Sequence, residues 1–242
     1  MTDPVDDRPV SRLEAWFRDH EPDEAIVPAS TVVLVRDGAQ GVEALMLRKN
    51  SKLAFGGMWV FPGGRIDDED RVGATSAEDA ARRAAVREAR EEAGLEVPPD
   101  TFDWFAHWTP PVGAPRRFAT WFFVGPAPEG AVTIDGGEIH DSAWMTASDA
   151  LTRRDAGEVE LAPPTWMTLH YLAEFPDVAA LMADARAREP DVYETAIART
   201  DDGMVAMWDG DAGYPTVDPA VPGSRHRLYM VRDGWRLERD VR

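Results

Sequence analysis

The sequence predicts an α/β fold in which a mixed β-sheet is flanked by helices and followed by an elaborated C-terminal third. Runs of β-branched and aromatic residues, which are typical of strands, occur before and after one long helical segment at residues 76–93. That segment is rich in alanine, which favours helix and allows close packing on a sheet. Two further helical segments follow residue 163. Strands and helices mixed in this way are typical of a sheet covered by helices.

The first third of the chain is expected to contain an arm, a hairpin and a glycine-rich turn. Residues 1–26 form the arm, with one short amphipathic helix at residues 12–18. Strands are predicted at residues 31–35 and 42–48, because turn-forming residues separate two apolar runs. A third strand, residues 58–61, leads directly into Pro62-Gly63-Gly64. The acidic stretch at residues 65–75 is expected to be irregular, with residues 67–70 forming a solvated insertion.

The long helix has recognisable ends, and shorter elements follow it. Ser76 followed by Asp79 resembles a capping box, and Gly94 is a natural residue to end the helix. Strands are predicted at residues 104–108, 117–124 and 142–145, and helices at residues 164–174 and 177–188. The last strands are expected at residues 204–208, 227–231 and 235–238.

The composition restricts the classes of partner. The chain has 242 residues, 44 acidic and 26 basic side chains and a formal net charge of −18. Such a charge opposes the approach of nucleic acids and anionic membranes, so neither is expected as a partner. The absence of cysteine excludes disulfides and cysteine nucleophiles. Together with an acidic N-terminus that does not resemble a signal peptide, it indicates a cytoplasmic protein.

The stretch R-E-A-R-E-E-A-G-L at residues 87–95 carries the strongest chemical signal. On a helix Glu88, Glu91 and Glu92 share one face, because they stand at positions i, i+3 and i+4. Neighbouring carboxylates raise one another's pKa unless a cation neutralises them, and Mg²⁺ and Mn²⁺ prefer oxygen ligands. The alternative is a solvated charged face with an ordinary Arg87–Glu91 pair. The Pro-Gly-Gly turn favours the metal site, because its bare backbone can approach a ligand.

These residues resemble the signature of the Nudix hydrolases, G-x5-E-x7-R-E-U-x-E-E-x-G-U, where U is a bulky aliphatic residue. Residues 87–95 match its last nine positions, with Ala89 at a U position. Counting back eight residues from Arg87 places Asp79 at the first Glu position, next to Glu78. Gly64 lies 87 − 64 = 23 residues before Arg87, whereas the signature has 14, so a nine-residue insertion near residues 67–75 is expected. Gly73 has the formal spacing but follows no strand, which favours Gly63-Gly64.

The resemblance implies a Nudix α/β/α sandwich at residues 27–160, with residues 161–242 as a helical and β extension packed on the same domain. It implies a hydrolase that cleaves the phosphoanhydride bond of a nucleoside diphosphate linked to another moiety. The implied cofactor is Mg²⁺ or Mn²⁺. A non-catalytic module that binds or senses a nucleotide is the alternative, and the resemblance leaves room for a homodimer.

The resemblance also implies roles for individual residues. Glu88, Glu91 and Glu92 correspond to metal ligands, joined by the carbonyl of Gly63, and Arg87 orients them with Asp79 or Glu78 as its partner. Glu88 is one candidate for the general base. Another is Glu138, which stands six residues before Trp144. The alternative for Glu138 is a loop glutamate exposed to solvent without a role in catalysis.

Three further motifs resemble the coenzyme A diphosphatase branch of the family, which acts on CoA. They are W-T-P at residues 108–110, R-R-F-A-T-W-F-F at residues 116–123 and P-P-T at residues 163–165. The upstream part of that branch's signature is met in part, since Leu53 stands where an arginine is expected. The branch resemblance suggests CoA or acyl-CoA as substrate. The candidate substrate-binding residues are Arg48, Arg65, Arg116 and Arg117.

Overall fold

The computed structural model describes residues 21, 25–50, 56–231 and 234–240. The chain divides into two compact units. The larger unit consists of Ile26–Thr109 and Phe118–Tyr193, and the smaller unit contains Pro110–Arg117 and Glu194–Arg242 together with the N-terminal Met1–Ala25. The helix predicted at residues 12–18 lies outside the described residues.

The larger unit is built on an eight-stranded sheet. Six strands follow the order β3-β2-β1-β6-β5-β8, while β4 pairs with β1 and β7 pairs with β2. Neighbouring strands β1 and β2 form the predicted antiparallel hairpin. The strands are β1 (Ile26–Gly38), β2 (Gly41–Lys49), β3 (Trp59–Val60), β4 (Gly63–Arg65), β5 (Asp103–Thr109), β6 (Arg117–Pro126), β7 (Ile139–Thr146) and β8 (Asp191–Glu194).

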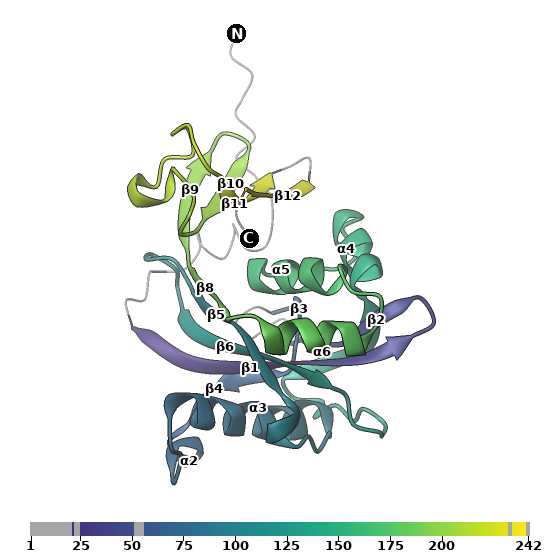
Figure 1. Ribbon diagram of the computed structural model, residues 1–242. Helices are drawn as coiled ribbons and strands as arrows, with labels where there is room; N and C mark the ends of the chain where they lie inside the picture. The colour runs from purple at the N-terminus through teal and green to yellow at the C-terminus, as the bar shows by residue number, and fades with distance from the viewer. Residues whose placement is uncertain (1–20, 22–24, 51–55, 232–233, 241–242) are drawn as a thin grey trace. The chain divides into compact units, whose positions relative to one another are not determined.

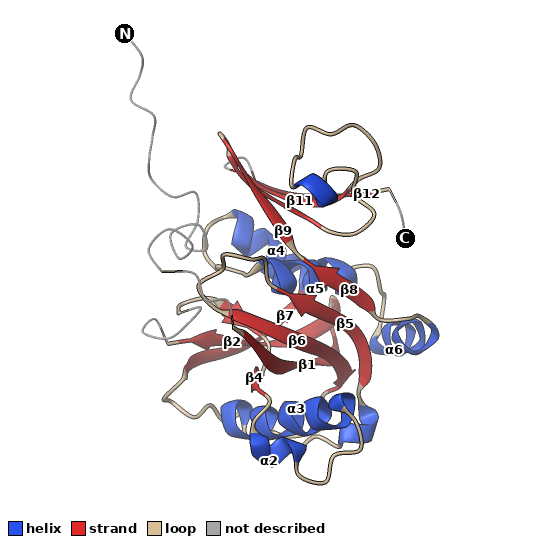
Figure 2. Ribbon diagram, turned by 90° about the vertical axis from the view of Figure 1, so that its left-hand side faces the viewer, coloured by secondary structure: helices blue, strands red, loops and turns tan. Residues whose placement is uncertain are grey.

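Helices cover both faces of this sheet (Figures 1 and 2). One face carries α2 (Asp68–Arg71) and α3 (Ala77–Ala93), near the 3₁₀ turn η1 (Pro99–Thr101). The opposite face carries α4 (Ala147–Asp155), α5 (Pro163–Leu172) and α6 (Val178–Ala187). This arrangement confirms the predicted α/β/α sandwich. Helices α5 and α6, which the sequence analysis placed in the C-terminal extension, belong to this unit, because the division falls after Tyr193.

Helix α3 packs on the sheet through small side chains. Ala80, Ala81, Ala84, Ala85, Ala89 and Ala93 are buried in a core that includes Val32 and Leu34 of β1 and Leu45 and Leu47 of β2. At the start of the helix, Ser76 Oγ accepts the N–H of Asp79 at 3.0 Å, and Gly94 ends it with φ of 67°. The predicted helix is therefore confirmed at both ends. Because alanine side chains are small, α3 packs closely on β1 and β4.

In the acidic stretch at residues 67–70, Asp67, Asp68 and Glu69 are exposed as predicted, whereas the helical conformation and the burial of Asp70 differ from the predicted irregular, solvated insertion. It folds into α2, and the Asp70 carboxylate accepts the N–H of Asp67 at 2.9 Å. Asp70 is only 6% exposed. A buried carboxylate requires a partner, and it finds one on α3.

Helix α4 and strands β8 and β9 were not predicted. Thr146 caps the start of helix α4, since its hydroxyl accepts the N–H of Asp149 at 3.1 Å. This capping signal is present in the sequence and would have revealed the helix.

The smaller unit is a four-stranded antiparallel sheet with the order β12-β11-β10-β9. Its elements are β9 (Ala196–Thr200), β10 (Gly203–Met207), the 3₁₀ turn η2 (Tyr214–Thr216), β11 (His226–Val231) and β12 (Gly234–Arg239). Three of these strands match the predicted ones. A buried ion pair between Arg227 and Asp211, at 2.6 Å, fixes the loop before β11.

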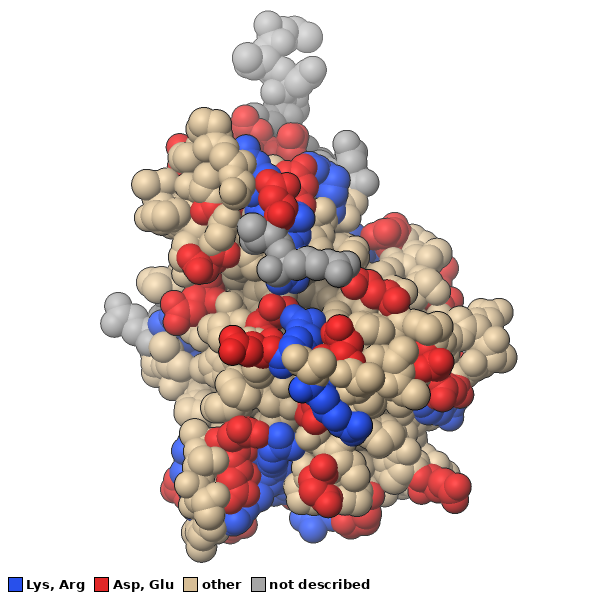
Figure 3. Space-filling model, in the orientation of Figure 1, with Lys and Arg blue, Asp and Glu red and all other residues tan. Residues whose placement is uncertain are grey.

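The surface drawn in Figure 3 carries acidic side chains spread over many elements, with basic side chains interspersed. Within the described residues, no helix is both long and apolar enough to cross a membrane.

Candidate active site on helix α3

The candidate site lies where the second half of α3 faces strand β4. In the pairing of β4 with β1, Gly63 stands opposite Thr31 and Gly64 opposite Ser30. A Cβ atom on Gly64 would lie 2.1 Å from Glu88 Oε1, and one on Gly63 would lie 2.4 Å from Thr31 Oγ1. At Gly63 backbone atoms of Ser30 and Thr31 leave no room for a side chain, and at Gly64 a side chain would have to displace the Glu88 carboxylate. The two glycines therefore let the carboxylate helix approach the strand backbone.

The geometry distinguishes the two candidates for the signature glycine. Gly73 adopts φ of +72° after α2, and the nearest atom to a Cβ built there is Arg83 Nη1 at 3.8 Å. Gly64, by contrast, is in direct contact with the Glu88 carboxylate. Gly64 thus has the role that the glycine of the signature requires, and Gly73 is a turn residue of the insertion.

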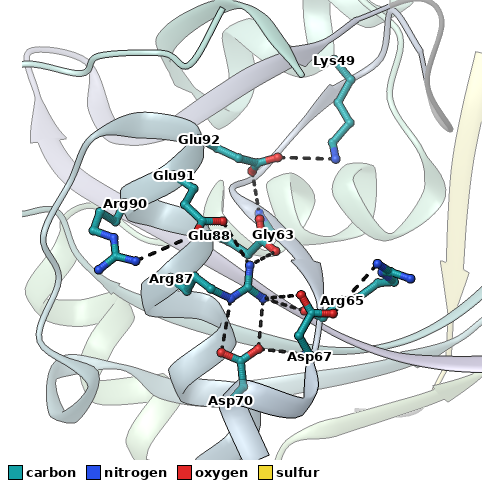
Figure 4. Close-up of polar contacts among 10 residues, drawn as sticks. All are labelled: Lys49, Gly63, Arg65, Asp67, Asp70, Arg87, Glu88, Arg90, Glu91 and Glu92. Carbon is teal, nitrogen blue, oxygen red and sulfur yellow. Dashed lines mark hydrogen bonds and ion pairs between the residues drawn. The ribbon is translucent and has the colours of Figure 1, made fainter. Parts of the chain in front are cut away.

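Arg87 is the centre of the polar network shown in Figure 4. Its guanidinium donates to Glu88 Oε1 at 2.7 Å and to Glu91 Oε2 at 3.2 Å, so it bridges two of the three glutamates. It also donates to the carbonyl of Arg65 at 2.9 Å, which ties α3 to β4. Partial burial opposes its charged form, but hydrogen bonds to Asp70 and Glu88 raise the pKa of Arg87. Arg87 is a permanent cation that orients the carboxylates.

The carboxylate that anchors Arg87 is Asp70, and the prediction of Asp79 or Glu78 is wrong. Asp70 accepts two hydrogen bonds from the guanidinium, at 3.0 and 3.3 Å. Asp79 instead binds Arg83 and the N–H of Thr75, and Glu78 binds Arg82. Eight residues of helix separate Asp79 from Arg87, a rise of roughly 12 Å, which is too far for a hydrogen bond.

The position of the insertion changes accordingly. Five residues separate Gly64 from Asp70, as in the G-x5-E half of the signature, with Asp in place of Glu. The nine additional residues therefore lie between Asp70 and Arg87, where 16 residues stand instead of seven. They form the end of α2, the Gly73 turn and the first residues of α3.

Glu92 is the most buried of the three glutamates, at 4% exposure. Its Oε2 accepts the N–H of Gly63 at 2.9 Å, and its Oε1 lies 3.5 Å from Lys49 Nζ (Figure 4). Burial raises the pKa of Glu92 to about 7, although Lys49 and the Gly63 N–H oppose this shift. Burial also raises the pKa of Glu88, against the influence of Arg87. Both shifts indicate negative charge that the protein compensates only in part.

The donor set fits a hard divalent cation such as Mg²⁺ or Mn²⁺. Three carboxylates share one helix face, and two of them are charged only at a cost from burial. In the described part of the chain, no three acidic or histidine side chains already converge on one point. Glu88 and Glu91 are turned toward Arg87, and Glu92 is turned toward Lys49 and Gly63. A cation would add the charge compensation that these contacts leave incomplete.

Glu138 lies in the loop before β7 and is exposed. Its backbone is held on both sides, since its N–H donates to Asp135 Oδ2 at 2.9 Å and its carbonyl accepts the N–H of Asn50 at 2.8 Å. Among the described residues, no hydrogen bond or ion pair joins its side chain to the glutamates of α3. Its role as a base stays a prediction.

The four candidate arginines are distributed over both units. Arg65 belongs to the site, because its carbonyl accepts from Arg87 and its exposed side chain lies 4.0 Å from Asp67. Arg48 is exposed on β2, next to Lys49. Arg116 and Arg117 belong to the smaller unit, where Arg117 donates to the carbonyl of Pro110 at 3.3 Å.

Sequence reasoning missed Asp70 and Lys49 as members of the site. The G-x5 spacing from Gly64 was a signal for Asp70. Lys49 had no such signal, because it meets Glu92 only through the pairing of strands in the sheet.

A comparison with protein-family models matches residues 26–174 to the NUDIX domain, which is more than half of the chain. The chain belongs to the Nudix family. No match was found among curated protein sequences. The Nudix signature, the carboxylate helix and the glycine contact at Gly64 thus belong to one and the same domain.

One solved structure agrees with this assignment, and a second is reported for its similarity alone. A NUDIX hydrolase from Alicyclobacillus acidocaldarius matches with a TM-score of 0.61 and 25% identity, over 66% of this chain and 96% of that chain. The NUDIX domain of Shewanella oneidensis NrtR, solved with ADP ribose, matches with a TM-score of 0.48 and 18% identity, over 66% and 96% of the two chains. The family and the first of these structures identify the chain as a Nudix hydrolase, a class of enzymes that act on nucleoside diphosphate derivatives.

Proposed function

We propose that this Nudix hydrolase uses Mg²⁺ or Mn²⁺, held by the glutamates of α3, to cleave the phosphoanhydride bond of a nucleoside diphosphate linked to another moiety. The observation that carries the proposal is the contact between the Gly63–Gly64 backbone and two carboxylates, Glu88 and Glu92. Glu91, the third, is joined to Glu88 through Arg87. A purely structural helix would not need two strand positions at which a side chain would meet backbone, as at Gly63, or displace a carboxylate of the helix, as at Gly64.

The residues of the site would divide the work as follows. Glu88, Glu91 and Glu92 would hold the metal, with the carbonyl of Gly63 as a further ligand. A bound divalent ion supplies charge withdrawal from the diphosphate and a lower pKa for a bound water. Arg87 holds Glu88 and Glu91 in place, and Asp70 holds Arg87.

The proton of the attacking water requires an acceptor carboxylate. Glu88 is suited to this role because burial raises its pKa toward the range in which a base is efficient. Glu138 is the second candidate, since its loop backbone is fixed by Asp135 and Asn50.

Activity should require a divalent cation and should be lost with a chelator. Glu91→Gln and Glu92→Gln each remove a charged ligand while keeping the shape of the side chain, so we expect kcat to fall by about 10²–10⁴-fold. The matched control is Glu78→Gln, because Glu78 stands on the same helix but binds Arg82. Turnover near that of the unmodified enzyme in both folded variants would contradict the proposed metal site.

CoA and acyl-CoA are the substrates that we propose to test first, on the strength of the sequence motifs at residues 108–110, 116–123 and 163–165. Hydrolysis would release adenosine 3′,5′-bisphosphate and a 4′-phosphopantetheine species, which mass spectrometry would detect. ADP-ribose and NADH contain the same anhydride and serve as competitors. If either has a kcat/KM at least ~10-fold higher, a difference of about 1.4 kcal/mol in transition-state binding, CoA is not the preferred substrate.

A further inference from the structure

Lys49 places an ammonium group inside the carboxylate site from a different element of the fold. It is the last residue of β2, its side chain is 17% exposed, and its Nζ lies 3.5 Å from Glu92 Oε1. The Nudix signature does not include this position. Its partner Glu92 comes from α3, 43 residues later in the sequence.

The two oxygens of Glu92 are not equivalent. Oε2 accepts the N–H of Gly63 at 2.9 Å, whereas Oε1 is buried and faces only Lys49 among the described residues. Oε1 has no hydrogen-bond partner among the described residues, so it is the Glu92 oxygen more available to a metal ion, whereas Oε2 already accepts the N–H of Gly63. The same oxygen is the one that Lys49 approaches.

A divalent ion and the Lys49 ammonium cannot both lie next to Glu92 Oε1 without a large electrostatic cost. Coulomb repulsion between charges about 4 Å apart is strong in a site shielded from water. Lys49 therefore stabilises the metal-free site, and it must give way when a metal binds.

We propose that Lys49 is a positioning residue that neutralises Glu92 in the metal-free enzyme and competes with the divalent metal for Glu92 Oε1, so that it sets the metal affinity of the site. The proposal rests on the proposed function, in which Glu92 is a metal ligand. It goes beyond that function by giving a residue outside the signature control over metal occupancy.

The test is a titration of the full-length enzyme with Mn²⁺ alone, with free Mn²⁺ followed by electron paramagnetic resonance at one fixed pH. Lys49→Met removes the competing charge, and we expect the dissociation constant for Mn²⁺ to fall by about 10-fold or more. Lys49→Arg keeps the charge and should stay within about 3-fold of the unmodified enzyme. Lys49→Gln retains a polar contact to Glu92 and should also tighten binding, which covers the case in which Lys49→Met does not fold.

Arg48→Met is the matched control, because it removes the same charge from the adjacent, exposed residue of β2. We expect a much smaller change in Mn²⁺ affinity than for Lys49→Met. If Arg48→Met raises the Mn²⁺ affinity as much as Lys49→Met does, the effect comes from the net charge of the protein and the proposal is overturned. Unchanged or weaker Mn²⁺ binding in Lys49→Met and Lys49→Gln would also overturn it.

Glu92→Gln separates this proposal from the proposed function. If Glu92→Gln weakens Mn²⁺ binding while the Lys49 variants leave it unchanged, the metal site stands and the role of Lys49 is wrong. If Glu92→Gln itself leaves Mn²⁺ binding unchanged, Glu92 is not a ligand and both proposals fail.

Discussion

Replacing Asp70 by Asn should lower both the stability and the kcat of the enzyme, although Asp70 lies outside α3. Asp70 is 6% exposed and accepts two hydrogen bonds from Arg87, whose side chain is 19% exposed. Asparagine keeps an oxygen that can accept the N–H of Asp67, so the principal loss is the negative charge opposite Arg87. Removing one partner of a buried ion pair typically costs about 3–5 kcal/mol. Arg87 retains Glu88, Glu91 and the carbonyl of Arg65, so we expect destabilisation of about 2–3 kcal/mol.

The same change should lower kcat, because Arg87 loses the anchor that fixes it against Glu88 and Glu91. We expect a fall of about 10–100-fold, the size usual for a small displacement of catalytic groups. Urea unfolding of the metal-free protein measures the stability, and steady-state kinetics with saturating Mg²⁺ measures kcat. Asp79→Asn is the control, since Asp79 binds Arg83 and Thr75 and should affect kcat by no more than ~3-fold. A larger loss in Asp79→Asn than in Asp70→Asn would refute the assignment of Asp70.

Three further predictions concern Glu92, the glycines and Glu138. The pKa of Glu92 is raised by burial from 4.5 to about 7, so the metal-free protein should lose stability as pH rises from 4.5 through 7, by at most about 3 kcal/mol. Urea unfolding with chelator at pH 5 and pH 8 should show a larger loss in the unmodified protein than in Glu92→Gln, where only the raised pKa of Glu88 still contributes; equal losses in both would contradict it. Gly64→Ala should lower kcat at least ~10-fold, because its Cβ would lie 2.1 Å from Glu88 Oε1. Gly73→Ala should instead cost about 1–2 kcal/mol of stability through its left-handed backbone and leave kcat within ~3-fold, and the reverse order of kcat would argue for Gly73. Glu138→Gln should lower kcat sharply and shift the acidic limb of the pH–rate profile if Glu138 is the base, whereas an unchanged profile would leave Glu88 in that role.

Much of the α3 site could be predicted from the sequence because the information is local. Helical periodicity places Glu88, Glu91 and Glu92 on one face without reference to the rest of the chain. Ser76 and Gly94 mark the ends of the helix through hydrogen bonds that span only a few residues. The alanines of α3 show where the helix packs on a sheet, and they are buried there.

Counting backward along the signature from Arg87 gave the wrong partner. Eight residues before Arg87 stands Asp79, which was therefore assigned to the acidic position. This assignment crossed the insertion, whose position in the sequence was not known. In the structure the partner is Asp70, which follows Gly64 at the G-x5 spacing. Helix α2 holds its carboxylate within hydrogen-bond distance of Arg87 on α3. An insertion preserves the spacing of the signature on each side but not across it. Counting forward from Gly64 and backward from Arg87 therefore gives different residues, because the insertion lies between Asp70 and Arg87.

The sequence by itself determined the α/β class, the carboxylate face of α3 and the presence of a Gly-Gly pair after the strand at residues 58–61, because each depends on residue type and short spacing. The structure places that pair in strand β4 and not in the predicted turn. Tertiary structure alone decided which carboxylate anchors Arg87, which glycine touches Glu88 and which cation faces Glu92. These contacts join α3 to α2, β4 and β2, at separations of 17 residues for Asp70, 24 for Gly64 and 43 for Lys49. They form only when burial of the alanine face of α3 brings these elements together, since no pattern in any one segment encodes its distance from another.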